Sequence, residues 1–216
     1  MSVRRLAPVA ALPGIPLVLL VGGFVSPTDS TDNATQLRAA AAHAVRWDIA
    51  ACLELFTAAL FPLAAVAVAR VVRERGGATA LAGAALAGLG TIGMASIGLR
   101  HLFIYGLATA PQAMALHALD RVDNAVGPII LLCMFGGPFA LIALTLAAAR
   151  AGIVPRLLVV AAVLFFISDS LPIPAAEEIQ GLIGLATFGY LARQLLSTRA
   201  AAHVPARRVD SIAAAA

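Results

Sequence analysis

The side chains that are able to do acid–base chemistry gather in a few segments of an otherwise apolar chain. Glu54 is the most informative, because it stands about five residues inside a long hydrophobic run, roughly 8 Å below its end if the run is helical. An ionisable group inside a membrane span usually faces the bundle interior and serves a function, and burial favours the neutral, proton-donating form of a carboxylic acid. We therefore predict that Glu54 is a catalytic acid. The alternative is a structural carboxyl group that pairs with Arg46, Arg100 or Arg121.

Two residues at the start of the same run belong with this acid. Trp47 precedes Glu54 by seven positions and shares its helical face, whereas Asp48 precedes it by six and is rotated by about 120°. Only a wide cavity would contact all three side chains. The alternatives are an interfacial anchor for Trp47 and an ion pair of Asp48 with Arg46 or Arg100.

A polar stripe precedes another apolar run. Within 111–124, His117, Asp120 and Asn124 recur at spacings of three and four, so they share one helical face. This face is either the wet side of an outer amphipathic helix or the lid of a pocket above the buried acid. Asp123, in the same segment, is a candidate for tuning or reloading that acid.

Two further residues complete the predicted catalytic set. His101 ends a third apolar run and either exchanges protons near neutral pH or lies at the membrane interface. Asp169, between two serines, is either a turn residue or part of the same pocket. The predicted catalytic residues are Glu54, Asp48, Asp123, Asp169 and His101.

The predicted substrate-binding residues combine aromatic and polar side chains. Aromatic faces stabilise cations, although ordinary packing explains each ring equally well when it is taken singly. The set is Trp47, Phe56, Phe103, Tyr105, Asn124, Phe135, His117 and Asp120.

The sequence predicts no metal and no cofactor. It has no His-x-x-x-His or Cys-x-x-Cys pattern, and Cys52 and Cys133 both fall inside apolar runs. It also has no lysine, which excludes a Schiff-base lysine and a phosphate-binding loop of the Walker type. Asp120 and Asp123 do not form an aspartate-rich motif for magnesium diphosphate.

Six apolar runs surround these candidates. The chain is 61% hydrophobic and 12% charged, whereas a soluble domain carries about 25% charged residues. The runs are Leu6–Val25, Ile49–Ala69, Thr79–Leu99, Ala125–Ala149, Pro155–Ser168 and Ile179–Ala192. We predict an all-α, polytopic membrane helix bundle with about six transmembrane helices. A single domain would cover residues 1–200, followed by a flexible cytoplasmic tail, 201–216.

Glycines in the third run predict close helix packing. Gly83 and Ala87 are four residues apart, as are Ala84 and Gly88, and small residues at this spacing let helices approach closely. We expect this helix to be central in the bundle.

Arginine placement predicts the orientation. With the N-terminus inside, eleven of the fifteen basic residues fall on the inner side: Arg4, Arg5, Arg70, Arg73, Arg75, Arg150, Arg156, Arg193, Arg199, Arg207 and Arg208. Cytoplasmic loops carry this excess, so we predict an integral inner-membrane protein with both termini cytoplasmic. The formal net charge of +4 is dispersed, which argues against a nucleic-acid partner.

Two segments resemble a large family of small bacterial membrane proteins, a domain of unknown function. They are Arg46-Trp47-Asp48, at the start of the second span, and the turn Ala149-Arg-Ala-Gly-Ile-Val-Pro-Arg-Leu-Leu. The resemblance implies a six-helix bundle and supplies no catalytic residues. In size, helical build and a few acids near one end, the chain is also similar to small integral-membrane terpene cyclases.

The predicted function is an enzyme that acts on a lipophilic small molecule. The favoured chemistry is a cofactor-independent, acid-initiated isoprenoid (terpene) cyclase or isomerase, in which a protonated acid starts the reaction inside a dry cavity. The alternatives are a lipid-binding or proton-coupled transport protein, and a structural membrane subunit without a small-molecule site. The expected partners are the substrate and membrane lipid, and the sequence does not predict the oligomeric state.

Overall fold

The chain is all-α throughout the part that the computed structural model describes, residues 3–28, 30–72, 76–168 and 176–202. These residues form α1 (Val3–Val25), α2 (Asn33–Ala42), α3 (Ala44–Ala69), α4 (Gly77–Leu107), α5 (Gln112–Arg150), α6 (Leu157–Ser168) and α7 (Ala176–Ala202). The predicted tail lies, from residue 203 onward, outside the described residues.

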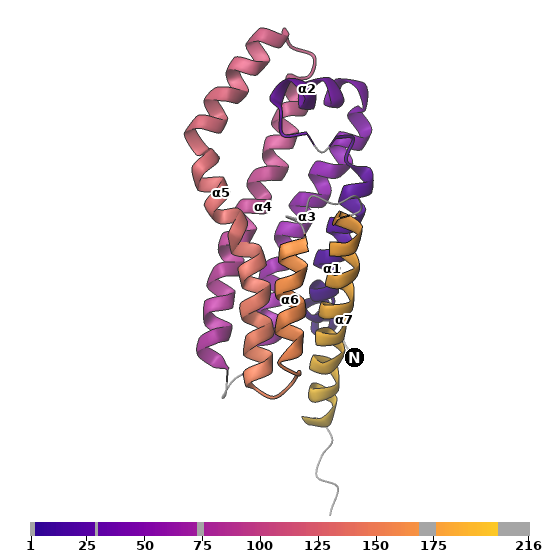
Figure 1. Ribbon diagram of the computed structural model, residues 1–216, viewed down its shortest axis with the longest axis vertical. Helices are drawn as coiled ribbons and strands as arrows, with labels where there is room; N and C mark the ends of the chain where they lie inside the picture. The colour runs from indigo at the N-terminus through magenta and orange to yellow at the C-terminus, as the bar shows by residue number, and fades with distance from the viewer. Residues whose placement is uncertain (1–2, 29, 73–75, 169–175, 203–216) are drawn as a thin grey trace, which may run out of the picture.

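Six of these helices run up and down in a ring, and α2 lies across one end (Figure 1). Apart from α2, each helix contacts the next one along the chain, and α7 returns to contact α1. The first residues of α1 and the last of α7 therefore lie at the same end. We call the other end, where α2 contacts α3, α4 and α5, the α2 end.

The interior of the ring is packed with apolar side chains. Leu12 of α1, Val68 of α3, Leu144 of α5 and Phe188 of α7 are all fully buried. Many alanines fill the space between them, which lets the helices pack closely.

The outside of the bundle is also apolar. Leu81 is 73% exposed and Leu157 is 75% exposed. Three helices are long and apolar enough to cross a membrane, over Leu6–Val25, Ala44–Ala69 and Gly77–Leu107, and shorter apolar stretches cover Phe135–Arg150 and Leu157–Ser168. Large exposed apolar surfaces indicate contact with another apolar phase, so the fold has the character of a membrane helix bundle.

The helices extend beyond several of the predicted runs. The polar segment 111–124 and the run Ala125–Ala149 form one continuous helix, α5, and not a separate outer helix followed by a span. No turn residue separates the two segments, and a helix gains a backbone hydrogen bond for each residue that continues it.

Glycine allows α4 and α5 to cross at close range. A Cβ atom at Gly90 would lie 2.5 Å from the Cα of Gly137, and one at Gly83 would lie 2.9 Å from the Leu144 side chain. Gly88, by contrast, has nothing within 4 Å of its Cβ position. The predicted close packing is therefore confirmed at Gly83, but Gly88 faces outward and α4 is a member of the ring between α3 and α5.

The turn between α5 and α6 is fixed by Gly152, whose φ of +73° suits a residue without a side chain. The N–H of Ile153 donates to the carbonyl of Ala148 at 3.0 Å, and that of Gly152 to Ala149 at 3.1 Å. This pair of bonds is the Schellman cap, which ends a helix and reverses the chain.

We predict that Gly90→Ala lowers the free energy of unfolding by about 1–3 kcal/mol, because the added methyl group overpacks the α4–α5 crossing. Thermal unfolding in detergent measures this. Gly88→Ala is the matched control and should not lower stability, since alanine favours a helix over glycine. Equal losses in both variants would contradict the crossing described here.

Candidate functional site

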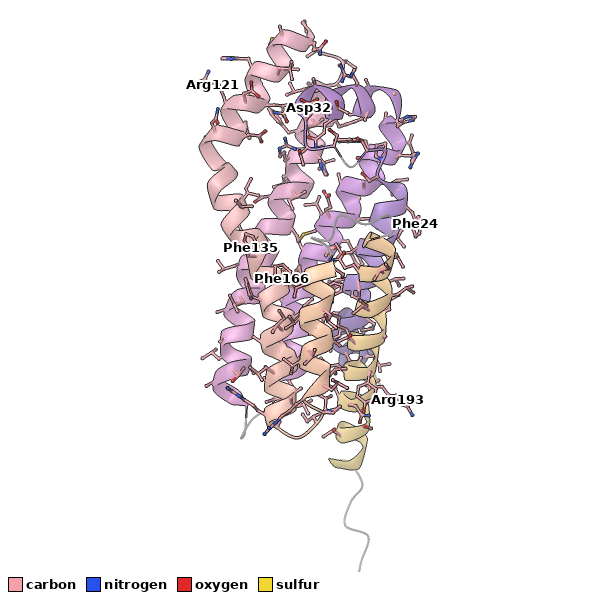
Figure 2. All side chains as sticks on the ribbon, viewed as in Figure 1. Phe24, Asp32, Arg121, Phe135, Phe166 and Arg193 are labelled. Carbon is pink, nitrogen blue, oxygen red and sulfur yellow. The ribbon has the colours of Figure 1, made fainter. Side chains whose placement is uncertain are left out.

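Polar side chains gather at the α2 end of the bundle, as Figure 2 shows around the labelled Asp32 and Arg121. Most of the acids and histidines predicted from the sequence lie here, on α3, α4 and α5. The structure sorts them into three groups: a partly buried acid–base pair, an ionic network, and side chains that face outward.

Glu54 of α3 and His101 of α4 form the acid–base pair. Oε2 of Glu54 lies 2.7 Å from Nδ1 of His101, and the two side chains are 22% and 20% exposed. Gly98, one turn before His101, permits the contact. A Cβ there would lie 2.8 Å from Leu55 and 3.0 Å from the carbonyl of Ala51. Close approach of α3 and α4 at this glycine brings the carboxyl group to the imidazole.

Trp47 of α3 also contacts His101. Its indole Nε1 donates a hydrogen bond of 2.8 Å to the carbonyl oxygen of His101, and the two rings meet edge to face with centroids 5.0 Å apart. The indole is 3% exposed, so Trp47 is a packed residue and not an anchor at the molecular surface. Its predicted place on the Glu54 face is confirmed.

A cavity of about 340 Å³ opens beside the pair and is lined by both Glu54 and His101. Its apolar wall consists of Val18, Leu19, Ala50, Leu53 and Met94. Its polar wall carries the hydroxyl groups of Ser26, Thr28, Ser30 and Thr31 and the amides of Gln36 and Gln180. The cavity lining therefore combines apolar and polar residues next to the acid–base pair.

Arg100 joins three helices in an ionic network. Its Nε and Nη2 donate to the two carboxylate oxygens of Asp123 at 2.8 and 3.0 Å. Nη1 donates to Oε1 of Gln36 at 2.9 Å, and Nη2 to Oδ1 of Asn33 at 2.6 Å. The Asn33 amide then donates to Asp123 at 3.1 Å and to Asp120 at 3.2 Å. Asp123 is thus held in a structural ion pair.

The hydrogen bond from Arg100 is the largest cause that holds the pKa of Asp123 below its usual range. Partial burial of the carboxyl opposes this effect, while Asn33 and the positive charge of Arg100 add to it. The anionic form of Asp123 is therefore the stable one, which does not suit a proton donor.

Two further polar groups support the chain at the α2 end. Asp32 caps α2 by accepting the N–H of Thr35 at 2.8 Å, and its hydrogen bonds with Thr35 lower the pKa of Asp32. Arg46 donates to the carbonyls of Phe24 and Val25, the last two residues of α1, and of Ser26, which follows it, at 3.1 to 3.3 Å. Among the described residues, Glu54 forms no ion pair with Arg46, Arg100 or Arg121, and its partner is His101. A structural role for this hydrogen-bonded acid stays the alternative prediction.

Other predicted catalytic residues do not join the pair. Asp48 is exposed and has no hydrogen-bond or ion-pair partner among the described residues. His117, Asp120 and Asn124 are exposed on α5, and Asp120 accepts a hydrogen bond from Asn33 of α2. None of the three lines the cavity, so the stripe does not form a lid over it. Asp169 lies outside the described residues.

The predicted aromatic residues, Trp47 apart, face outward. Phe56, Phe103, Tyr105 and Phe135 are 40–55% exposed, and none lines the cavity. Phe135 packs instead against Phe166 of α6, with ring centroids 6.3 Å apart, and both are labelled in Figure 2. The structure therefore brings no aromatic ring from this set of four to the acid–base pair.

The amides and hydroxyl-bearing residues of the site are not among the residues predicted from the sequence. Asn33 and Gln36 come from a short helix without an apolar run, and the loop hydroxyls stand in a segment without a motif. The cap at Asp32 was a usable signal, because an aspartate before a run of good helix formers predicts a helix start.

Within the described ranges, no three His, Cys, Asp or Glu side chains are grouped so as to hold a metal ion. Comparisons of the chain with protein-family models, curated proteins and solved structures found no match.

We predict that acid destabilises the parent protein more steeply than an Asp123→Asn variant. The pKa of Asp123 is lower in the folded protein than in the unfolded chain, where it is about 3.9. The carboxylate therefore stabilises the fold fully at a pH above the unfolded-state pKa, and this contribution is lost as the pH falls through the lower folded-state pKa. Denaturant unfolding in detergent between pH 7 and 3 measures the difference. Asp48→Asn, which removes an exposed carboxyl group, should keep the parent's steepness, and equal slopes in all three proteins would contradict the prediction.

Proposed function

We propose that the chain is an integral inner-membrane protein with six crossings, formed by α1, α3, α4, α5, α6 and α7, and with both termini in the cytoplasm. Three long apolar helices, two shorter ones and the apolar exterior support this placement. In the ring of six helices, the start of α1 and the end of α7 lie on the same side of the bundle. The arginine excess assigns that side to the cytoplasm.

Reporter fusions test the topology. Alkaline phosphatase fused at Ala110, between α4 and α5, should be active in the periplasm, whereas the same enzyme fused at the C-terminus should be inactive. A fluorescent protein at the C-terminus should give the converse result. Phosphatase activity at the C-terminus would contradict the proposed cytoplasmic location of this end of the chain.

We further propose that the protein is a membrane-embedded enzyme that transfers protons on a lipophilic small molecule, with Glu54 and His101 as its general acid and base. The observation that carries this proposal is the 2.7 Å contact between the two groups at the wall of a cavity. The pair can hold one proton, and His101 keeps its other ring nitrogen for a substrate. A group within hydrogen-bond reach of the reacting atom is the geometric requirement for such catalysis.

Isomerisation by proton shift is the form of this chemistry that the site favours over cyclisation. One member of the pair adds a proton to the substrate and the other removes one, so the product has the substrate's composition. A cyclase must stabilise a migrating cation, and the four outward-facing aromatic rings do not reach the cavity. The resemblance to terpene cyclases stays a hypothesis that concerns size and helical build.

The cavity walls favour an amphiphilic substrate. An apolar body would lie against Leu19 and Leu53, and a hydroxyl or carbonyl head would lie near Ser26, Thr28, Ser30 and Thr31. A cavity of about 340 Å³ is within the range of small-molecule sites.

A proton-coupled transporter is supported less well, because apolar packing closes the bundle beyond the cavity. Val68, Leu144 and Leu191 are fully buried there and offer no polar path to the opposite end. A lipid-binding protein remains the alternative, and the experiment below separates it from an enzyme.

The test is solvent deuterium incorporation. Purified protein in D₂O is incubated with membrane lipid extract and a panel of prenyl alcohols and ketones, and products are followed by chromatography and mass spectrometry. We expect an isomer of altered retention that carries solvent deuterium. Glu54→Gln and His101→Asn should each lower its rate by about 10²–10⁴-fold, the usual contribution of general acid–base catalysis.

Asp48→Asn is the matched control, since it removes an acid from the same helix without touching the pair, and it should keep the parent's rate. A lipid that co-purifies with the parent and is lost in Glu54→Gln, without turnover, would replace the enzyme by a binding protein. Undiminished turnover in Glu54→Gln would leave this carboxyl group a structural role only.

A further inference from the structure

The end of the bundle opposite α2 carries a second cavity that the proposed reaction does not use. It measures about 750 Å³ and lies between α5 and α6. Its lining consists of Leu146, Ala149, Arg150, Arg156, Val159 and Val160. Two guanidinium groups thus share one opening with a wall that is otherwise aliphatic.

The turn between α5 and α6 fixes the two arginines on the rim. The Schellman cap at Gly152 reverses the chain, so Arg150 ends one helix and Arg156 directly precedes the next. Nη1 of Arg150 donates to Oγ1 of Thr79 at 2.5 Å, which anchors this side chain to α4. Arg156 is exposed.

Neither arginine forms an ion pair with an acid among the described residues. Glu74, which follows α3 in the sequence, lies outside the described residues. Two cations without an anionic partner in the described part of the chain, next to exposed aliphatic side chains, match a ligand that is anionic at one end and apolar along its length. Val160 is 52% exposed and Leu157 is 75% exposed, so the aliphatic surface continues along α6 from the rim.

We propose that this cavity binds an anionic phospholipid, with its phosphate between Arg150 and Arg156 and an acyl chain along α6. Guanidinium groups bind phosphate oxygens through paired hydrogen bonds, and basic pockets between membrane helices bind anionic headgroups. The proposal depends on the membrane placement above, and it is independent of the chemistry at Glu54.

Native mass spectrometry tests the proposal. The full chain is reconstituted in vesicles of equal phosphatidylglycerol and phosphatidylcholine, extracted in mild detergent, and weighed with its retained lipid. We expect the parent to retain one phosphatidylglycerol, and an Arg150→Gln/Arg156→Gln variant to retain at least about tenfold less. Arg193→Gln is the matched control, because it removes another exposed arginine at the same end (Figure 2), and it should retain lipid as the parent does.

Further arms separate the possible outcomes. Excess inorganic phosphate should not displace the lipid, and displacement would assign the cavity to free phosphate and overturn the proposal. Equal retention of phosphatidylcholine, or an equal loss of lipid in Arg193→Gln, would also overturn it. Glu54→Gln should retain the lipid, so a failed isomerase does not count against this site. If the double variant does not fold, Arg156→Gln alone, an exposed substitution, should lower retention by at least about threefold, and unchanged retention would overturn the proposal.

Discussion

The Arg100 guanidinium is the group on which the α2 end of the molecule depends. It sits near the end of a long apolar helix, where an unpaired charge is costly, and each of its partners comes from another helix. Asp123 belongs to α5, and Asn33 and Gln36 belong to α2. Pairing this one cation therefore draws α2 across the end of the ring and ties the first half of α5 to α4. Gln36 also lines the cavity, so the same network shapes the candidate site.

A second constraint acts two residues before Arg100 on α4. Gly98 lets the backbones of α3 and α4 approach closely, and that approach joins Glu54 to His101. Ion pairing positions the outer wall of the cavity, whereas glycine packing positions the reactive pair. Arg100 and Gly98 are two residues apart, but one acts through ion pairing and the other through close helix packing. A substitution at Arg100 should therefore affect the position of Gln36 in the cavity wall more than the contact between Glu54 and His101.

Helical periodicity correctly predicted that Trp47 and Glu54 share a helical face. Applied to Phe56 and Phe103, the same periodicity would have placed these two rings on the outside of the bundle. The seven-residue spacing of Trp47 and Glu54 placed both side chains on the face that meets His101. Phe56, however, is two residues from Glu54, which is about 200° around a helix, and Phe103 has the same relation to His101. Their outward positions follow from that angle. Contacts between Arg100 and Asn33 join residues far apart in the chain, and neither local spacing nor composition predicts such a pair.

Trp47 is the only tryptophan in the chain, and its ring lies against His101. All indole fluorescence of the protein therefore originates beside the candidate site, from a buried ring whose N–H is already engaged by the histidine carbonyl. The protein carries an intrinsic optical reporter at this position. His101 lines the cavity and contacts this ring, so a change in emission when a compound is added would report a change beside the acid–base pair in native, unlabelled protein.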